Sequence, residues 1–492
     1  MNRHVVILGG GLTGLSSAFH LSRRFPEALI TLVEKTSRFG GWISSERVQV
    51  RDGDGRTAEI VLESGPRTLR PNAKSVLELI HLLGLKNSVI TTPITSSAAK
   101  DRYLQIPETQ GLITLPNSLT SIFSPPMRTL FLPHVLREPA KRRNRPDGIT
   151  DETVDNFMTR RFGPTFARTF GSALVHGIYA ADSRKLSVRA AFPSLWAMED
   201  RGWGSVVRGA LLPNPTVSRG DYDVGDIPDM MKGVSVYSFK DGIGMLPGAL
   251  ATHLRNQSNV ELLRDNPISS LRVADDGQLE VKLSSGQMIN PTHVISALPL
   301  PVLDGLLHPT SSLPHLTASP ASSVVVLNLI FPQTQPKLHP SGFGYLVPRP
   351  PSGYSPHNPG ILGTVFDSCA LSAQDSNAAN FTKMTVMMGG PNPITSSHTE
   401  VDTVLKQLSV HLTAPDDYLK VLPEPIYTRT QRHDDCIPNP MPGHLRRMEE
   451  LKTALAKGAW SGRLEVVGAG VRGVSLGDCV ESGKRAGESW TC

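Results

Sequence analysis

The stretch that most constrains the fold of this chain is its glycine-rich N-terminus. The apolar residues 5–8 are followed by a turn with GxGxxG spacing at 9–14, and then by apolar residues at helical spacing, which predicts a strand, a turn and a helix. Gly9 permits the tight turn, Gly11 lets backbone N–H groups approach a pyrophosphate, and Gly14 lets the helix pack closely on the strand. A dinucleotide-binding βαβ unit is therefore predicted.

A second strand and an acidic residue strengthen this prediction. The apolar run 29–33 ends in Glu34, whose carboxylate could accept hydrogen bonds from both ribose hydroxyls of an adenosine. The glycine spacing alone is a weak signal, because any glycine-rich turn can imitate it. The following RFGGW at 38–42 suits a chain that passes beneath a second phosphate, and it resembles the GG motif of glutathione-reductase-like flavoproteins of the amine oxidase type. We therefore favour FAD over NAD.

Composition limits the class of protein. The 492 residues, 39% apolar and 19% charged, suffice for about three globular domains. The net charge of +6 suits an anionic membrane or an acidic substrate, and equally an ordinary solvated surface. The four cysteines are widely spaced, so we expect reduced thiols and no metal site. The longest apolar run, 324–331, is too short to cross a bilayer, and the first strand begins so early that we expect any targeting signal to be internal.

Three stretches resemble the protoporphyrinogen oxidase family, flavoenzymes of haem and chlorophyll synthesis. They are VVILGGGLTGLSSAFHLSR at 5–23, RFGGWI at 38–43 and ESGPRTLRP at 63–71. The likeness covers about residues 4–485 and is weakest at 120–150, 203–235 and 350–360. It implies an α/β and α+β fold: a Rossmann-like FAD-binding domain of the glutathione-reductase/amine-oxidase type, an antiparallel-sheet substrate domain and a helical membrane-binding insertion.

The resemblance implies three domains. Later glycine-rich turns at 238–247 and 468–473 return the chain to the first domain, and β-branched runs between 322 and 388 predict the antiparallel sheet. We assign 1–95, 234–309 and 460–492 to the FAD-binding domain, 96–212 to the helical membrane-binding domain, and 213–233 with 310–459 to the substrate-binding domain.

The resemblance also implies one non-covalent FAD per chain. In the family the GPR loop runs beside the flavin, and the last helix directs its positive end at the flavin ring, where it would stabilise negative charge. The cofactor-binding residues expected on this basis are Gly9, Gly10, Gly11, Leu12, Thr13, Gly14, Glu34, Lys35, Gly41, Trp42, Gly65, Pro66, Arg67, Thr68, Leu262, Ala469, Val474, Ser475 and Leu476.

The substrate site follows from the same resemblance. Arg102 matches an arginine that contacts a propionate of the tetrapyrrole, a role that suits the two-pronged guanidinium; a solvent-facing arginine is the alternative. Gly177 matches a glycine that lets the substrate approach the backbone, whereas His176 departs from the arginine of animal members and is left out of the site. Apolar walls for the flat macrocycle are expected at Phe343, Leu346, Val365 and Met387. Without the resemblance these four would be read as core.

The implied activity is the six-electron oxidation of protoporphyrinogen IX to protoporphyrin IX in haem biosynthesis. Three hydrides would pass to flavin N5 and three O₂ would become three H₂O₂. We expect no catalytic side chain, because the cofactor carries the redox chemistry. One alternative is another amine-oxidase-like FAD oxidase acting on an amine or a carotenoid, although an amine site would need an aromatic cage. A non-catalytic, membrane-bound FAD protein is the other.

Residues 122–145 place apolar side chains beside basic ones, which suits the surface of an anionic membrane. A basic loop fits the residues equally well, and the family's monotopic membrane association favours the membrane. For a eukaryotic source we expect peripheral attachment to the mitochondrial inner membrane on its intermembrane-space side. Further expected partners are a second copy of the chain, as a homodimer, and ferrochelatase. We expect no nucleic-acid partner.

Overall fold

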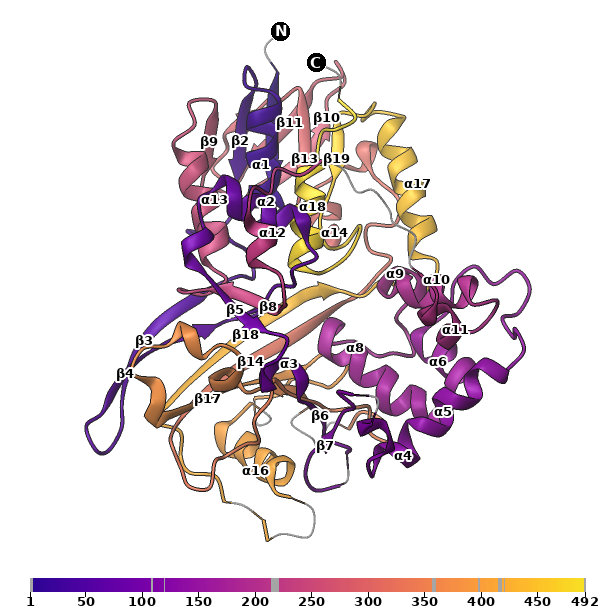
Figure 1. The fold of residues 1–492 in the computed structure, drawn as a ribbon. Helices are drawn as coiled ribbons and strands as arrows, with labels where there is room; N and C mark the ends of the chain where they lie inside the picture. Colours follow the sequence, from indigo (N-terminus) through magenta and orange to yellow (C-terminus); the bar gives the residue numbers. More distant parts are fainter. Residues whose placement is uncertain are drawn as a thin grey trace.

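The computed structural model describes residues 3–107, 109–118, 120–213, 221–355, 360–396, 399–414, 418–419 and 421–490. Figure 1 shows a parallel sheet near the two termini, a large antiparallel sheet at the other end, and a layer of helices beside the second sheet. The candidate site lies where these three parts meet.

The parallel sheet has five strands in the order β19-β13-β1-β2-β9. They are β1 (His4–Leu8), β2 (Leu29–Val33), β9 (Val260–Leu263), β13 (His293–Ser296) and β19 (Leu464–Val466). Alternate residues of β1 enter two different cores, Val5 and Ile7 on one side and Val6 and Leu8 on the other. Burial on both faces explains why the strand is continuously apolar. The three ranges predicted for FAD binding each supply strands to this sheet.

Helices cover one face of the parallel sheet and a smaller sheet covers the other. The first face packs on α1 (Leu12–Arg24), α2 (Lys74–Leu82), α13 (Met245–Arg255) and α18 (Leu476–Lys484). The second packs on α17 (His444–Ala456) and on the antiparallel strands β10 (Ile268–Val273), β11 (Leu279–Leu283) and β12 (Met288–Ile289). Gly277 lies in the turn that joins β10 to β11.

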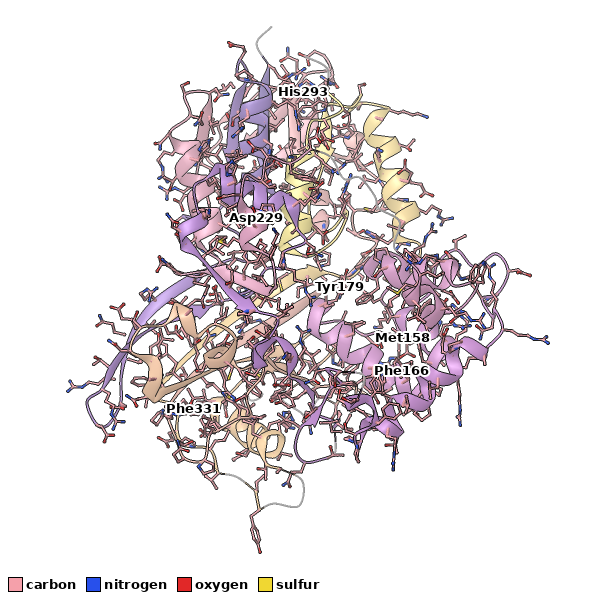
Figure 2. All side chains as sticks on the ribbon, in the orientation of Figure 1. Met158, Phe166, Tyr179, Asp229, His293 and Phe331 are labelled. Carbon is pink, nitrogen blue, oxygen red and sulfur yellow. The ribbon has the colours of Figure 1, made fainter. Side chains whose placement is uncertain are left out.

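The mainly antiparallel sheet has seven strands in the order β18-β14-β17-β16-β15-β6-β7, and each neighbouring pair is antiparallel except β15 and β6, which are parallel. Its strands are β6 (Arg102–Leu104), β7 (Ile113–Thr114), β14 (Ala321–Pro332), β15 (Gly344–Leu346), β16 (Ile361–Val365), β17 (Phe381–Gly389) and β18 (Tyr427–Pro438). One face is buried with α16 (Val401–Leu412) in a core that includes Phe331, which Figure 2 places in this sheet. The strands expected between 322 and 388 are confirmed.

Two predicted domain ranges need correction. The range 96–212 is not wholly helical, because Arg102–Leu104 of β6 pairs with Gly344–Leu346 of β15 and extends the antiparallel sheet. The range 213–233 does not belong to the substrate sheet where the structure describes it, since Ile227 and Met231 are buried in the core around α1. Residues 214–220 lie outside the described residues. In both cases the partner strand or core is distant in sequence, so local composition did not indicate it.

The helical layer has its own apolar core and its own ion pairs. In Figure 2, Met158 and Phe166 lie inside this layer, and Tyr179 lies at the end of α8 nearest the sheets. Its elements are α4 (Met127–Leu130), α5 (Leu132–Arg137), α6 (Val154–Phe162), α7 (Pro164–Phe166), α8 (Ser172–Tyr179), α9 (Val188–Ala191), α10 (Pro193–Arg201) and α11 (Val206–Leu211). None of the helices in the described residues is long and apolar enough to span a bilayer.

Two smaller strand pairs connect the layers. The hairpin of β3 (Ser45–Arg51) and β4 (Thr57–Glu63) projects from the molecule in Figure 1, and β5 (Val89–Pro93) pairs with β8 (Val234–Phe239). The remaining helices are α3 (Ser97–Lys100), α12 (Ile227–Met230), α14 (Leu300–Asp304) and α15 (Asp367–Ala370).

Candidate functional site

The glycine turn between β1 and α1 leaves room beside Gly11. Gly9 has a φ of +99°, and a Cβ on Gly14 would lie 1.9 Å from the Gly9 carbonyl oxygen, so both positions require glycine. A Cβ on Gly11 would meet only the Cα of Gly41, at 4.0 Å. Gly11 is the N-cap of α1 and offers no side-chain cap, so the N–H groups of the first turn face this space. The cradle fits an anionic diphosphate.

A second glycine loop closes the cradle from the other side. The Gly40 N–H donates to the Gly10 carbonyl at 2.9 Å. Arg38 shapes this loop by donating to the carbonyls of Ile43 at 2.9 Å and Gly41 at 2.7 Å. The glycine turn and the RFGGW segment, predicted from the sequence as parts of one site, therefore lie against each other.

Glu34 lies at the end of β2 beside the glycine turn and is 9% exposed. Its Oε2 accepts a hydrogen bond from the Gly10 N–H at 2.8 Å, and its Oε1 accepts from the N–H and hydroxyl of Thr36 at 2.9 and 2.8 Å. Since the Gly10 N–H is the one hydrogen-bond donor to Oε2 among the described residues, this oxygen retains accepting capacity for a ribose hydroxyl. Leu262 is opposite Leu32 in the neighbouring strand, and Lys35 is exposed.

The C-terminal segment completes the nucleotide-facing end of the parallel sheet. Gly468 lies against Thr13, where a Cβ would be 3.5 Å from the threonine hydroxyl. Helix α18 packs beside α1 and begins at Ser475, which forms a capping box with Asp478. The carboxylate of Asp478 already offsets part of the positive helix end that we expected to face the flavin. Ala469, Val474 and Leu476 are half-buried around this turn.

The GPR loop joins the parallel-sheet unit to the antiparallel sheet. His433 of β18 donates from Nε2 to the Ser64 carbonyl at 2.6 Å, and its ring meets the Trp42 indole edge-on at 5.4 Å. Gly65 lies close to the Trp42 carbonyl, with 3.4 Å to a Cβ placed there. Arg67 is buried and ion-pairs with Asp367 at 3.0 Å. Of its neighbours in the loop, Pro66 is exposed and Thr68 half-buried.

Four of the predicted substrate residues share one face of the seven-stranded sheet. Pairing places Arg102, Gly344, Val365 and Thr385 in one cross-strand row, and Leu346, Gly363 and Met387 in a row two residues away. Since alternate residues of a strand point to opposite faces, these rows face the same side. Four side chains of these rows are half-buried among buried neighbours, namely Arg102, Leu346, Val365 and Met387. A partly open apolar wall requires this degree of exposure.

The other two predicted substrate residues adjoin this wall. A Cβ on Gly177 would lie 2.9 Å from both terminal methyls of Leu346, so α8 approaches the sheet here by its bare backbone. The Phe343 ring is 5.6 Å from the guanidinium carbon of Arg102. The Nε of Arg102 is buried and has no hydrogen-bond partner among the described residues. Burial and the nearby Arg70 lower the pKa of Arg102 from its ordinary value. A guanidinium whose buried Nε lacks a partner among the described residues is suited to a carboxylate.

His176 lies behind the wall and is held neutral. Its Nδ1 and the Val347 carbonyl are 2.7 Å apart, and its Nε2 and the Tyr354 hydroxyl 2.9 Å apart. Burial lowers the pKa of His176 to about 4. The neutral ring therefore donates to the carbonyl and accepts from the hydroxyl, and it supplies no cation to a substrate.

Sequence reasoning missed the hydrogen-bonded residues Asp367, Thr385 and Asn328 beside the wall, and it also missed His433, which bonds to the GPR loop. One available signal was an aspartate two residues after Val365, and another was a single asparagine inside the apolar run 324–331. Metal ligation is not seen: in the described part of the chain no three His, Cys, Asp or Glu side chains gather closely enough to hold an ion. Burial raises the pKa values of Cys436 and Cys479 to about 11, which makes both thiols poor nucleophiles.

Comparison with known proteins agrees with this geometry. The profile of the family described as flavin containing amine oxidoreductase matches residues 12–488. Protoporphyrinogen oxidase of Macaca fascicularis is 35% identical over 99% of this chain and 98% of its own length. The enzyme of that name from Schizosaccharomyces pombe is 32% identical, covering 97% and 96%. A solved candidate protoporphyrinogen oxidase from Exiguobacterium sp. 255-15 shares the fold, with a TM-score of 0.73 at 23% identity over 99% of this chain and 98% of that one. The chain therefore belongs to the flavin-containing amine oxidoreductases and, within them, to the protoporphyrinogen oxidase family.

Proposed function

We propose that this oxidoreductase binds FAD and oxidises protoporphyrinogen IX to protoporphyrin IX in haem biosynthesis. The observation that carries the proposal is a single sheet face on which Arg102, with its buried Nε unpaired among the described residues, lies among Leu346, Val365 and Met387. Relatives that bear the name of this activity, at 32% to 35% identity over nearly the whole chain, support it.

The proposed substrate matches the wall in shape and charge. A porphyrinogen is a broad apolar macrocycle with two propionates on one edge. The apolar side chains would cover one face of the ring, and α8 would support Leu346 from behind, because the bare backbone at Gly177 lies against the Leu346 methyl groups. Arg102 would grip a propionate and set which methylene bridge faces the flavin loop at Gly65–Arg67. The arrangement provides orientation, which is the protein's share of the work in a cofactor enzyme.

The protein's residues hold the cofactor and leave the redox chemistry to it. Glu34 would bind the adenosine ribose, and the N–H groups at Gly11–Thr13 would bind the diphosphate. When bound, FAD would supply the redox chemistry, a six-electron oxidation by three hydride transfers, with three O₂ reduced to three H₂O₂. Arg102 stays cationic at neutral pH. We assign proton transfer to no side chain, in keeping with the sequence-based expectation.

The test is a porphyrin assay with purified, flavin-loaded protein. Mixing it with protoporphyrinogen IX in air should raise porphyrin fluorescence well above autoxidation in a protein-free control, with three H₂O₂ formed per porphyrin. Parallel mixtures with a primary amine and with a carotenoid should give no H₂O₂. Peroxide from either, without porphyrin formation, would favour the alternative amine-oxidase-like activity. An intact flavin that none of the three reduces would favour a non-catalytic protein.

We also propose that the helical layer attaches the protein peripherally to an anionic membrane, the mitochondrial inner membrane on its intermembrane-space side. Phe123 and Leu136 are 62% and 67% exposed, and Arg128, Arg137, Arg142 and Arg143 are exposed nearby in sequence. Lys141 and Arg145 are less available, because they bond to the Arg161 carbonyl and to Glu199. Exposed apolar groups close in sequence to exposed cations favour this segment for binding anionic headgroups. A homodimer and contact with ferrochelatase remain predictions.

Membrane attachment can be tested with point variants. Deleting 122–145 would remove Glu138, which pairs with the fully buried Arg161, and would therefore disturb folding. Instead, Phe123→Ser/Leu136→Ser and Arg142→Ser/Arg143→Ser should each reduce cosedimentation with cardiolipin vesicles. Lys232→Ser, at an 80% exposed cation outside the layer, is the matched control. Unchanged binding of both double variants would remove this segment from the proposal. Salt should weaken binding of the wild type in part.

A further inference from the structure

A chain of buried polar side chains links the GPR loop, called the flavin loop below, to the apolar wall that contains Leu346, Val365 and Met387. Arg67 and Asp367 form an ion pair at 3.0 Å, and both side chains are 4% exposed. The second carboxylate oxygen of Asp367 accepts a hydrogen bond from the Thr385 hydroxyl at 2.6 Å. Flavin and substrate binding, as assigned above, give no role to Asp367 or Thr385.

The chain continues across the antiparallel sheet. Asn328 donates to the Thr385 hydroxyl oxygen at 2.9 Å and accepts two hydrogen bonds from Arg429, at 3.1 and 3.0 Å. It also donates to the Glu63 carbonyl at 3.3 Å. The network thus extends from the GPR loop through β17 and β14 to β18, and it returns to the strand that leads into the loop.

The network shares its strands with the wall. Thr385 is opposite Val365 and two residues before Met387, so the three side chains lie on one face of the sheet. Asp367 follows Val365 by two residues. Arg67 is in the same loop as Gly65 and donates to its carbonyl at 3.4 Å. The Arg67–Asp367 pair is therefore a direct mechanical link between the loop and the wall.

Stability alone does not explain a buried ion pair. Removing two charges from water is costly, and apolar groups of similar volume often serve the fold equally well. The pair instead fixes the orientation of the Arg67 and Asp367 side chains, because each charged group is held by hydrogen bonds of defined geometry. The position of the Gly65–Arg67 loop over the sheet is thereby set.

We infer that Asp367 is a positioning residue for the proposed oxidation: it holds Arg67 and so fixes the separation between the flavin loop and the Val365–Met387 wall. The inference rests on the proposed function. Misplacing reacting groups by about 1 Å can lower a rate about a hundredfold. Loss of the Asp367 charge should therefore slow flavin reduction more than it weakens substrate binding.

The chain offers a matched control in the Lys383–Asp375 pair. These side chains are 4% and 3% exposed and 2.8 Å apart, and both bond to the backbone of Val61 at 2.9 Å. This pair also joins the antiparallel sheet to the strand before the GPR loop, but it does not reach Gly65–Arg67. Asp367→Asn and Asp375→Asn should therefore cost similar stability and differ in their effect on the flavin.

The experiment compares the two variants as flavin-loaded proteins. Anaerobic reduction at saturating protoporphyrinogen IX should slow about tenfold or more in Asp367→Asn, with KM within about twofold of wild type. The visible spectrum and midpoint potential of its bound flavin should also shift, and Asp367→Glu should recover part of the rate. Asp375→Asn should keep the wild-type rate, spectrum and potential while its Tm falls. Should Asp367→Asn fail to fold, the apolar double variant Arg67→Met/Asp367→Leu takes its place with the same expectation.

Equal behaviour of the Asp367 and Asp375 variants in rate, spectrum and potential would overturn the inference and leave the pair a structural contact. Failure of the proposed function would look different, since wild-type flavin would then not be reduced by the porphyrinogen at all. Even in that case, the spectra and potentials of the two variants would still decide whether Asp367 positions the flavin loop.

Discussion

Adding a methyl group at Gly11 should remove the cofactor without harming the fold. A Cβ there meets nothing nearer than the Cα of Gly41 at 4.0 Å, and the backbone angles, φ −70° and ψ −179°, suit any L-residue. Gly11→Ala should therefore leave the cofactor-free protein as stable as wild type, or more stable by about 0.4–1 kcal/mol through the unfolded chain. The branched Gly11→Val fills the same space more completely.

The methyl group would occupy the approach to the first turn of α1. If two charge-assisted hydrogen bonds to the diphosphate are lost, at about 1.5–3 kcal/mol each, FAD affinity falls by roughly two to four orders of magnitude. Titrating cofactor-free protein with FAD, followed by flavin fluorescence, measures this loss, and a melt without FAD checks the fold. Gly14→Ala is the contrasting control, because its Cβ would lie 1.9 Å from the Gly9 oxygen and should destabilise the cofactor-free protein itself. Stoichiometric FAD in purified Gly11→Val would refute the assignment.

Three further predictions concern the substrate, the flavin linkage and pH. Arg102→Ala should raise KM about tenfold to a hundredfold with kcat near wild type, and Arg102→Lys should recover part of the loss; steady-state kinetics showing a collapsed kcat at unaltered KM would contradict this. Acid precipitation should release the yellow flavin into the supernatant, and flavin that stays in the pellet would show a covalent bond. Burial lowers the pKa of His176 from 6.5 to about 4, so as the pH falls the unfolded chain binds a proton at this ring before the folded protein does. The contribution of neutral His176 to the free energy of unfolding is therefore complete above pH 6.5 and is lost as the pH falls towards 4. Urea unfolding should show that the free energy of unfolding is about 2 kcal/mol lower at pH 5 than at pH 7 because of this group, and that the difference is smaller in His176→Asn. The same difference in the two proteins would rule out His176 as its source.

The parts of the fold that depend on local residue patterns could be predicted from the sequence. Glycine spacing predicted the turn at 9–14, because a Cβ at Gly14 cannot be accommodated, and β-branched runs predicted β14 and β17. Strand β18 was not predicted, because its Thr, Arg, Gln, His and Asp residues form no apolar, β-branched run. Its backbone nevertheless pairs along most of β14, so tertiary pairing outweighs local propensity there.

The candidate site likewise has residues that could be predicted and residues that could not. The resemblance identified wall residues that the structure brings onto one sheet face, and on the sequence alone they were expected to be core. The partner of Arg67 could not be predicted, because Asp367 is three hundred positions away and ion-pair choice depends on three-dimensional packing. The borders of the helical range failed for a related reason: the resemblance implied a strand at 101–104, but its pairing with β15 depends on three-dimensional packing.

The most direct test of the central claim is the colour of the flavin under protoporphyrinogen IX without oxygen. The account predicts that flavin-loaded protein bleaches as porphyrin fluorescence appears, and that admitting O₂ restores the yellow absorbance with release of H₂O₂. An oxidised flavin that persists in the presence of saturating protoporphyrinogen IX would contradict it.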